Sequence, residues 1–219
     1  IEREAFRCSC IKKLEFQPHS KLLSIGECAF NDSDIKKFTI PKHVKRIGKY
    51  AFYFCTNLKV VEISDDSDLI SIGEGAFSCT SIRSISIPAH FKDSSGGWYN
   101  QSLKVELLNI IVSPKNQYFT FTEDGLLLAK SELGIDDFDI LVFARRDIKR
   151  AMIPSSIKRI APYCFHYCRN LHEIEFSPNS QLTYICTNSF SNSSIETIMI
   201  PSNVSVIEDH SFIKCEKSL

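Results

Sequence analysis

A short pattern, Ile-Gly-x-x-Ala-Phe, occurs at residues 25–30 and again at 47–52. A Phe preceded by a small residue recurs at intervals of 22 to 25 residues within each of two stretches of the chain. These residues are Phe6, Phe30, Phe52 and Phe77 in the first stretch, and Phe165, Phe190 and Phe212 in the second. Self-similarity at this period is typical of solenoids, in which one structural unit is stacked many times.

Each of these Phe residues up to Phe190 is followed, five or six residues later, by a six-residue segment in which apolar and polar residues alternate. Alternation with β-branched residues predicts a short strand with one buried face. The predicted strands span 11–16, 35–40, 58–63, 82–87, 148–153, 171–176 and 195–200, with an eighth at 107–112. One such unit cannot bury its own apolar face, so stacked units would pair their strands in parallel and share a continuous core.

Two kinds of corner alternate after these strands. In the short kind, Pro follows the strand directly, as in 40–47, 153–160 and 200–207. In the long kind the connection is two residues longer, as in 16–25, 63–72 and 176–185. Pro removes a ladder donor and ends the pairing, and a longer corner is tolerated at the surface. The alternation therefore belongs to the loops and leaves the buried ladder in register.

The segment 35–58, IKKFTIPKHVKRIGKYAFYFCTNL, closely matches the pattern L-x-x-I-x-I-P-x-x-V-x-x-I-G-x-x-A-F-x-x-C-x-x-L, and 195–215 matches it more loosely. This pattern resembles the BspA-like class of leucine-rich repeats, over nearly the whole chain outside 89–147. The resemblance implies a leucine-rich repeat solenoid. Its curved parallel β-sheet would form the concave side, and short helical or 3-10 turns with short strands would form the convex side.

The middle of the chain fits the same resemblance less regularly. Residues 116–130 resemble a hairpin-forming insertion of such arrays, which predicts a β-hairpin within 113–147 that turns at Glu123-Asp124-Gly125. Trp98-Tyr99 stand where the next Ala-Phe is expected, and we interpret them as a bulky substitute for the core Phe. The later rungs replace the Gly of Ile-Gly by Ala161, Cys186 and Glu208, which predicts looser corners there.

We therefore expect one solenoid domain over 1–219, with regular repeats at 1–88, an irregular rung and hairpin insertion at 89–147, and regular repeats at 148–219. Ile1 falls partway through a rung and Leu219 falls where the next strand should begin, so we expect a fragment of a longer array. The charged start Ile1-Glu2-Arg3 is no signal peptide, and no apolar run approaches the roughly 18 residues of a membrane span.

Composition excludes some classes of partner. Lys plus Arg equals Asp plus Glu at 26 each, so the net charge indicates neither a nucleic acid nor a membrane surface. The chain has no G-x-S-x-G, H-E-x-x-H or Gly-rich phosphate-binding motif, so we expect neither an enzyme nor a cofactor. His166 stands near Cys168, which leaves a nucleophile pair as an alternative to a structural turn. Tyr118, Phe119 and Phe121 could form a sugar platform, although alternation in a hairpin predicts that one side packs on the core.

The nine cysteines are an odd number without a CxxC pair, which argues against a zinc site. Five of them recur at what we interpret as one place in the repeat: Cys8, Cys55, Cys79, Cys168 and Cys215. A residue repeated in this way favours packing between rungs, because free Cys behaves as a small buried hydrophobe. A disulfide, for example between Cys55 and Cys79, and a metal site are the alternatives.

Cations recur at two positions of the predicted strands. The second position holds Lys12, Lys36, Lys59, Arg83 and Lys149, and then His172 and Glu196; the third position adds Lys13, Lys37 and Arg150. Like charges at rung spacing repel, so stability of the fold gives no reason for these rows. Two interpretations stay open: a solvated edge that resists aggregation, or a ligand-binding row for an acidic host or matrix protein or an anionic glycan.

Proteins of the BspA-like class are found mainly on the surfaces of mucosal bacteria and protozoan parasites, where they are implicated in adhesion. The resemblance thus implies a non-enzymatic cell-surface or secreted module that binds a protein or glycan through the concave face. The alternative is an intracellular or receptor-borne scaffold without an adhesive role. Four glycosylation sequons in predicted turns, at Asn31, Asn100, Asn192 and Asn203, favour an extracellular setting only weakly, because turns are rich in Asn and Ser anyway.

Overall fold

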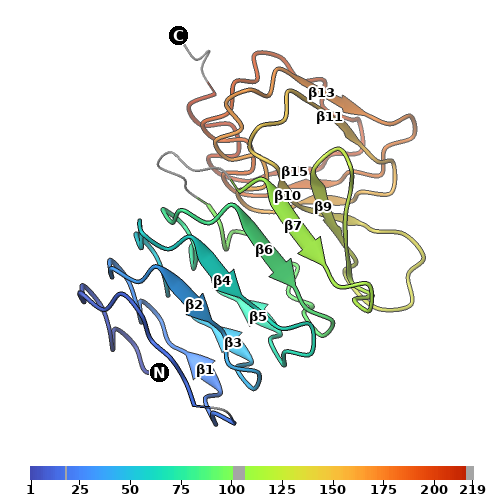
Figure 1. Cartoon of the computed structure of the whole chain (residues 1–219). Helices are drawn as coiled ribbons and strands as arrows, with labels where there is room; N and C mark the ends of the chain where they lie inside the picture. Colours follow the sequence, from blue (N-terminus) through green and yellow to red (C-terminus); the bar gives the residue numbers. More distant parts are fainter. Residues whose placement is uncertain (18, 101–106, 216–219) are drawn as a thin grey trace. The chain divides into compact units, whose positions relative to one another are not determined.

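The structure, a computed structural model, describes residues 1–17, 19–100 and 107–215 (Figure 1). The chain forms two compact units. Unit 1 consists of Ile1–Asp93 and Gly97–Gln117, and unit 2 consists of Ser94–Gly96 and Tyr118–Leu219. The described residues form fifteen strands and no helix, and the strands of each unit are joined by turns.

Unit 1 is a stack of rungs, and four of them contribute one strand each to a first face. The strands of this face are β2 (Lys37–Thr39), β4 (Val60–Glu62), β6 (Ser84–Ile87) and β7 (Asn109–Val112). β2 pairs with β4 and β6 pairs with β7, both in parallel, and β4 lies beside β6 (Figure 1). These strands confirm the predictions at 35–40, 58–63, 82–87 and 107–112. The predicted strand at 11–16 is reduced to one parallel bridge between Lys13 and Lys37.

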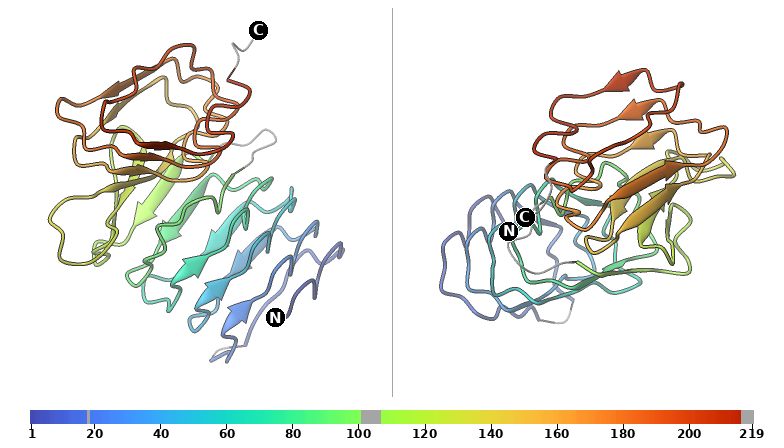
Figure 2. Two further views of the ribbon diagram at one scale, coloured as in Figure 1. Left: turned by 180° about the vertical axis from the view of Figure 1, so that it is seen from behind. Right: turned by 90° about the horizontal axis from the view of Figure 1, so that it is seen from above.

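A second face of unit 1 consists of shorter strands. These are β1 (Ser24–Ile25), β3 (Arg46–Ile47) and β5 (Ser71–Ile72), which pair in parallel in that order. In each, the Ile side chain is buried. Figure 2 shows the successive rungs of unit 1, in blue to green, each passing from one face to the other through a corner.

Unit 2 repeats this plan around a six-stranded sheet. Its strands run in the order β15 (Val206–Ile207), β14 (Tyr184–Ile185), β12 (Arg159–Ile160), β10 (Ile140–Ala144), β9 (Leu126–Ala129) and β8 (Phe119–Phe121). The opposite face contains the parallel pair β11 (Arg150–Ile153) and β13 (Glu173–Phe176), which agrees with the predictions at 148–153 and 171–176.

The hairpin region joins the ladder of short strands in unit 2. β8 and β9 are antiparallel and are connected through the turn at 123–125. β10 pairs antiparallel with β9 and parallel with β12, so it is the strand at which the direction of pairing changes. All five residues of β10 are buried. A strand buried on both sides shows no alternation of apolar and polar residues, which is why the sequence pattern did not indicate it.

The predicted strand at 195–200 is wrong, because no strand is formed there. Ile195 is 6% exposed and packs in the core of unit 2, and Ile198 and Ile200 are partly buried against that core. The segment thus keeps an apolar side, but it is held by side-chain packing and not by a ladder of backbone hydrogen bonds.

Stacked Phe rings form the centre of each unit, as the repeat predicted. In unit 1 the ring centroids of Phe6 and Phe30, Phe30 and Phe52, and Phe52 and Phe77 are 4.9, 5.0 and 5.5 Å apart. In unit 2 the pairs Phe165–Phe190 and Phe190–Phe212 are 4.9 and 4.8 Å apart. Trp98 and Tyr99 are 4% and 3% exposed, and the Trp98 carbonyl accepts from the Phe77 N–H at 3.0 Å. Two buried aromatic residues therefore stand next to the Phe77 rung, as the sequence predicted for the irregular rung.

The turns that hold these rings correct one expectation. Short helical or 3-10 turns were expected, but the described residues there form turns with two left-handed residues each. In one rung, Tyr50 and Phe54 have φ of 54° and 60°. Between them, Phe52 donates its N–H to the Ala76 carbonyl of the next rung at 2.8 Å. In this rung the N–H groups of Tyr50, Phe52 and Phe54 all donate to carbonyls of the next rung, so hydrogen bonds between rungs replace those of a helix.

The Gly of the Ile-Gly pair lies where consecutive rungs approach most closely. A Cβ on Gly48 would lie 2.6 Å from the backbone nitrogen of Glu27, and one on Gly73 would lie 2.5 Å from that of Lys49. In unit 2 the same place is taken by larger residues, yet the hydrogen bond between rungs persists. The Cys186 N–H donates to the Ile160 carbonyl at 3.0 Å, compared with 2.8 Å for the Gly48 N–H and the Ile25 carbonyl.

Candidate functional site

The first face of unit 1 presents a row of cations. Lys12, Lys36, Lys59 and Arg83 occupy the second position of successive rungs, and all four side chains are exposed. Their backbones are in direct register: the Lys36 N–H donates to the Lys12 carbonyl at 3.1 Å, and the Lys59 N–H donates to the Lys36 carbonyl at 3.0 Å. Neighbouring rungs of a sheet lie about 4.8 Å apart. We call these four residues the unit-1 basic row.

The next position along the strands is also cationic, but its charges are compensated. Lys13 lies 2.6 Å from Glu15, and Lys37 lies 2.6 Å from Glu62. Thr39 donates to the same Glu62 carboxylate at 2.6 Å. The hydrogen bond from Lys37 holds the pKa of Glu62 below its usual value. The ion pair joins adjacent rungs, since Lys37 and Glu62 belong to the paired strands β2 and β4.

The unit-1 basic row has no such compensation. Within residues 1–17, 19–100 and 107–215, none of its four side chains forms an ion pair with Asp or Glu. The sequence predicted two equivalent rows of cations, whereas the structure distinguishes an unpaired row from a paired one. Four positive charges therefore remain available to a ligand along one side of this face.

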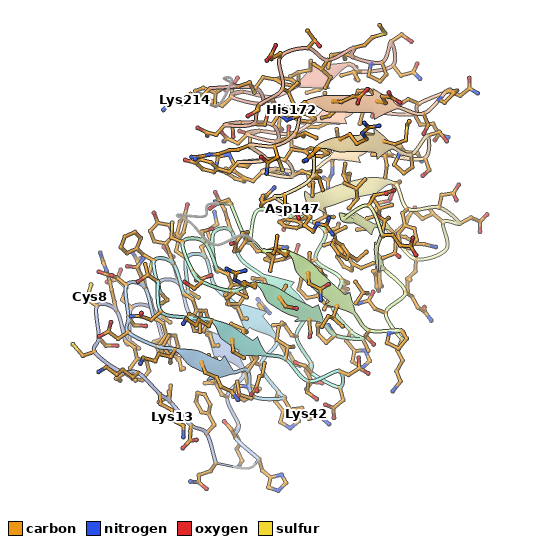
Figure 3. The ribbon with its side chains drawn as sticks, turned by 45° about the horizontal axis from the view of Figure 1, so that its top comes forward. Cys8, Lys13, Lys42, Asp147, His172 and Lys214 are labelled. Carbon is orange, nitrogen blue, oxygen red and sulfur yellow. The ribbon has the colours of Figure 1, made fainter. Side chains whose placement is uncertain are left out.

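The remaining predicted positions lie in unit 2. Lys149 and Arg150 are exposed, and Arg150 lies 3.8 Å from Glu173 of the next rung. The backbone N–H of His172, which is labelled in Figure 3, donates to the Lys149 carbonyl at 2.9 Å. His172 therefore follows Lys149 at the second position of the next rung. The second position of the rung after that is Glu196. In unit 2 the second position therefore holds one lysine, Lys149, and is followed by a histidine and a glutamate in the next two rungs.

Five of the cysteines are buried, namely Cys55, Cys79, Cys164, Cys168 and Cys186, whereas Cys8 and Cys10 are exposed. All nine are free. Cys55, Cys168 and Cys215 follow the core Phe by three residues, whereas Cys8 and Cys79 follow it by two and have left-handed backbones. Cys8, Cys55, Cys79 and Cys168 all stand three residues before a predicted strand, but the number of residues from the Phe to that strand is five in some rungs and six in others. The assignment to a single place was therefore wrong.

Cys55 shows what a thiol contributes at the position three residues after the core Phe. Its Sγ donates to the Phe30 carbonyl of the preceding rung at 2.9 Å and lies 3.4 Å from Ser33 Oγ. Burial raises the pKa of the Cys55 thiol. Cys215 makes the equivalent bond to the Phe190 carbonyl at 3.2 Å. A buried, protonated thiol that binds a carbonyl is a structural element and a poor nucleophile.

His166 and Cys168 each contact another group. His166 is 6% exposed, and its Nδ1 lies 3.0 Å from the Ser191 carbonyl. Burial lowers the pKa of His166 to about 4, with a smaller contribution from the charge of Arg146. Cys168 Sγ instead lies 3.6 Å from Arg146 Nη1.

Arg146 is a buried cation that lies outside the repeat pattern of the sequence. It is 3% exposed, and its guanidinium donates to the carbonyls of Cys164 and Tyr163 at 2.6 and 3.1 Å. The guanidinium also lies 4.5 Å from the centre of the Phe143 ring. Arg146 thereby binds the backbone of the first regular turn in unit 2. No repeat pattern could have indicated it, because it stands in the irregular segment.

Other candidate sites receive less support from the structure. Phe119 is 4% exposed and packs on the core, whereas Tyr118 and Phe121 are both partly exposed. Burial at this place therefore does not follow a strict alternation, which would put Phe119 and Phe121 on the same side. Among the residues described, no group of three or more His, Cys, Asp or Glu side chains could hold a metal ion. The same residues include no helix that is long and apolar enough to cross a membrane.

Comparison with known proteins places this geometry in a family. A family profile described as "BspA type Leucine rich repeat region (6 copies)" matches residues 1–121 and 133–218. The pneumococcal vaccine antigen PcpA has a similar structure, with a TM-score of 0.84 and 24% identity over 97% of this chain and 51% of its own. This chain thus spans about half of the length of that antigen. Comparison with curated proteins gives no significant match.

Two further solved structures share the fold. A leucine-rich cell surface protein from Faecalibacterium prausnitzii A2-165 has a TM-score of 0.70 and 20% identity over 98% of this chain and 68% of its own. A leucine-rich repeat protein from Eubacterium ventriosum ATCC 27560 has a TM-score of 0.55 and 18% identity over 90% of this chain and 69% of its own. At these identities the likeness shows the solenoid fold alone.

Proposed function

Because the chain belongs to the BspA-type leucine-rich repeat family, we propose that it is a non-enzymatic binding module of a cell-surface or secreted protein. Its ligand is an acidic host or matrix protein or an anionic glycan, bound on the face formed by β2, β4, β6 and β7. The surface location is supported by the Faecalibacterium structure, which is described as a cell surface protein. The role in adhesion follows from the resemblance of the repeats.

The observation on which this proposal depends is the unit-1 basic row. Lys12, Lys36, Lys59 and Arg83 are exposed, in register, and without carboxylate partners among the described residues, while the adjacent Lys13 and Lys37 are neutralised. A fold that only needed a soluble edge has no reason to keep like charges stacked at rung spacing. An extended anion that lies across the rungs relieves this repulsion.

Each contact contributes little by itself. An exposed ion pair is worth on the order of 0–1 kcal/mol. Several cations that act on one extended anion still give a useful affinity and accelerate the encounter. A chain with zero net charge can therefore bind an anionic ligand locally.

Charge reversal on the basic row tests this proposal. We expect the triple variant Lys36→Glu, Lys59→Glu and Arg83→Glu to lose retention on heparin and on immobilised acidic matrix proteins. The matched control reverses Lys21, Lys45 and Arg46, three exposed cations without an ion pair in the part of the chain that the structure describes, and changes the net charge by the same amount. The control should be retained like the unmodified chain. Equal retention of both variants, with both folds intact by circular dichroism, would refute the proposal.

A further inference from the structure

Alternation of long and short corners produces a groove in unit 1. The long corner at 16–25 is two residues longer than the short corner at 40–47 of the next rung. Between them lies a groove of about 610 Å³. Its lining includes Glu15, Phe16, Ser20, Pro41 and His43. Lys42, labelled in Figure 3, also lines it and forms an ion pair with Asp66 at 2.6 Å.

Unit 2 contains a second groove at the equivalent place. It has a volume of about 760 Å³ and lies between the long corner at 176–185 and the short corner at 200–207. Its lining includes Glu175, Phe176, Ser180, Pro201 and Asn203.

The two grooves correspond residue by residue. Each residue that lines the second groove stands 160 positions after a residue that lines the first. Glu, Phe, Ser, Ile and Pro are identical at their places in both grooves, and His43 is matched by the amide Asn203. The same side chains thus surround the same hollow in two separate units, which an accidental irregularity of one surface would not produce.

Local hydrogen bonds shape both long corners in the same way. Ser20 Oγ accepts from the Leu22 N–H at 3.3 Å, and Ser180 Oγ accepts from the Leu182 N–H at 3.3 Å. One position before each Ser, the backbone is left-handed, with φ of 65° at His19 and 61° at Asn179. In unit 2, Asn203 Nδ2 donates to the Ser180 carbonyl at 2.8 Å and ties the short corner to the long one.

The third long corner, at 63–72, is not followed by a short corner of the kind found at 40–47 and 200–207. The segment that follows it contains Phe91, which is only 2% exposed. Asn116 Nδ2 donates to the carbonyls of Pro88 and Phe91 at 2.7 and 2.9 Å and fixes this segment. Glu62 precedes this corner as Glu15 and Glu175 precede the other two. Its carboxylate is bound by Lys37 and by Thr39, which lines the groove of unit 1.

The chemistry of the lining indicates the ligand. Phe176, Pro201 and Met199 supply apolar surface, and Asn179, Asn203 and three Ser residues supply hydrogen-bonding groups. Glu175 is the charged side chain of this lining, and a carboxylate repels anions and accepts hydrogen bonds from hydroxyl groups. Apolar surface combined with a few polar groups in a volume of this size suits a small ligand. Sugars have this combination of hydroxyl groups and apolar ring faces.

We propose that each unit binds a neutral saccharide in its corner groove. The Glu carboxylate accepts hydrogen bonds from sugar hydroxyls, and the Phe and Pro side chains pack against the C–H face of the ring. The inference does not depend on the unit-1 basic row, which would bind anions. It predicts two sites of the same kind in one chain.

Nuclear magnetic resonance titration of the full chain tests the proposal, with lactose, mannobiose and N,N′-diacetylchitobiose as probes. We expect at least one sugar to shift the backbone amides of Ser20 and Lys42 in unit 1, and of Ser177, Ser180 and Ser202 in unit 2. Glu175→Gln should weaken binding in the unit 2 groove by roughly tenfold, because a hydrogen bond to a charged acceptor is lost. Glu15→Gln should weaken binding in unit 1 less, because the Glu15 carboxylate is shared with Lys13 at 2.6 Å. The control Glu27→Gln, at an exposed residue that lines neither groove, should leave both titrations unchanged.

Several results would overturn the proposal. No shifts with any of the three sugars, or shifts confined to residues outside both grooves, would contradict it. Shifts at the grooves with an oligo-lysine peptide but not with sugars would assign them to basic peptides instead. The charge-reversed variant of Lys36, Lys59 and Arg83 should bind sugars normally, so failure at the grooves is distinguishable from failure of the proposed anion-binding function.

Discussion

At the scale of single residues, the Ile-Gly pair is explained by close contact between backbones. Gly48 has an ordinary φ, so its conformation does not require glycine. In unit 1 the position of Gly48 requires glycine, because a Cβ would lie 2.6 and 2.7 Å from backbone atoms of Glu27 and Gly26. The sequence revealed the repeat of this Gly, but only the spacing between rungs explains it.

We expect Gly48→Ala to destabilise the protein by about 1–3 kcal/mol, the usual cost of overpacking. Chemical denaturation followed by circular dichroism measures this change. Gly→Ala normally stabilises a protein where the backbone can accept it, because the unfolded chain loses entropy. The sign is therefore decisive: a more stable Gly48→Ala variant would contradict the close approach of the rungs.

His166 makes the stability of unit 2 depend on pH. Burial lowers the pKa of His166 to about 4, compared with 6.5 for an exposed imidazole. The unfolded chain therefore binds a proton at higher pH than the folded chain does. The stabilisation from a neutral His166 is complete above about pH 6.5 and is lost as the pH falls towards 4, by up to about 3 kcal/mol.

The prediction for His166 requires a comparison with His166→Gln, because many carboxyl groups also titrate in this range. The free energy of unfolding of each protein is measured between pH 7 and pH 4 by urea denaturation. The difference between the two proteins should narrow as the pH falls, since the variant has no imidazole to protonate. A constant difference over the whole range would show that His166 is not buried in its neutral form.

At the scale of structural elements, alternation of apolar and polar residues was enough to predict most strands of the first face. It failed at β10, whose five buried residues do not alternate. It also gave no warning of the left-handed turns, since residues such as Tyr50 and Tyr163 have no special preference for positive φ. In these turns the hydrogen bonds between rungs override local preference.

The left-handed turns allow a test at Asn192, whose φ is 56° and whose N–H donates to the Ile213 carbonyl at 3.0 Å. We expect Asn192→Ala to be less stable than Asn192→Gly by about 1 kcal/mol, because a Cβ disfavours this conformation. Lys158 is exposed and its φ is not positive, so Lys158→Ala should instead be more stable than Lys158→Gly. Thermal unfolding of the four variants gives both comparisons. The same order at both positions would contradict the turn geometry.

The candidate site shows a similar limit to prediction. The alternation pattern indicated that both rows of cations face solvent, and the structure agrees. It could not show that Lys37 is neutralised, because its partner Glu62 stands 25 residues away and reaches it only through the register of β2 and β4. Pairing between rungs is a property of three-dimensional register, which a single strand sequence does not contain.

At the scale of the whole molecule, a net charge of zero conceals a segregation of charge. In unit 1 the acidic residues Glu15 and Glu62 neutralise the third position of the strands and leave the second position positive. Net charge is thus a poor guide to partners in a repeat protein, because repetition places like residues side by side. The arrangement predicts local attraction of anions without a global field.

The most direct test of this claim is the affinity of the unmodified chain for heparin as a function of salt. The screening length contracts from about 30 Å at 0.01 M to about 8 Å at 0.15 M ionic strength. We predict binding that weakens steeply over this range, and a dependence on salt that nearly disappears in the variant with Lys36, Lys59 and Arg83 reversed to Glu. Absence of binding at low salt, or the same dependence on salt in both proteins, would contradict the account.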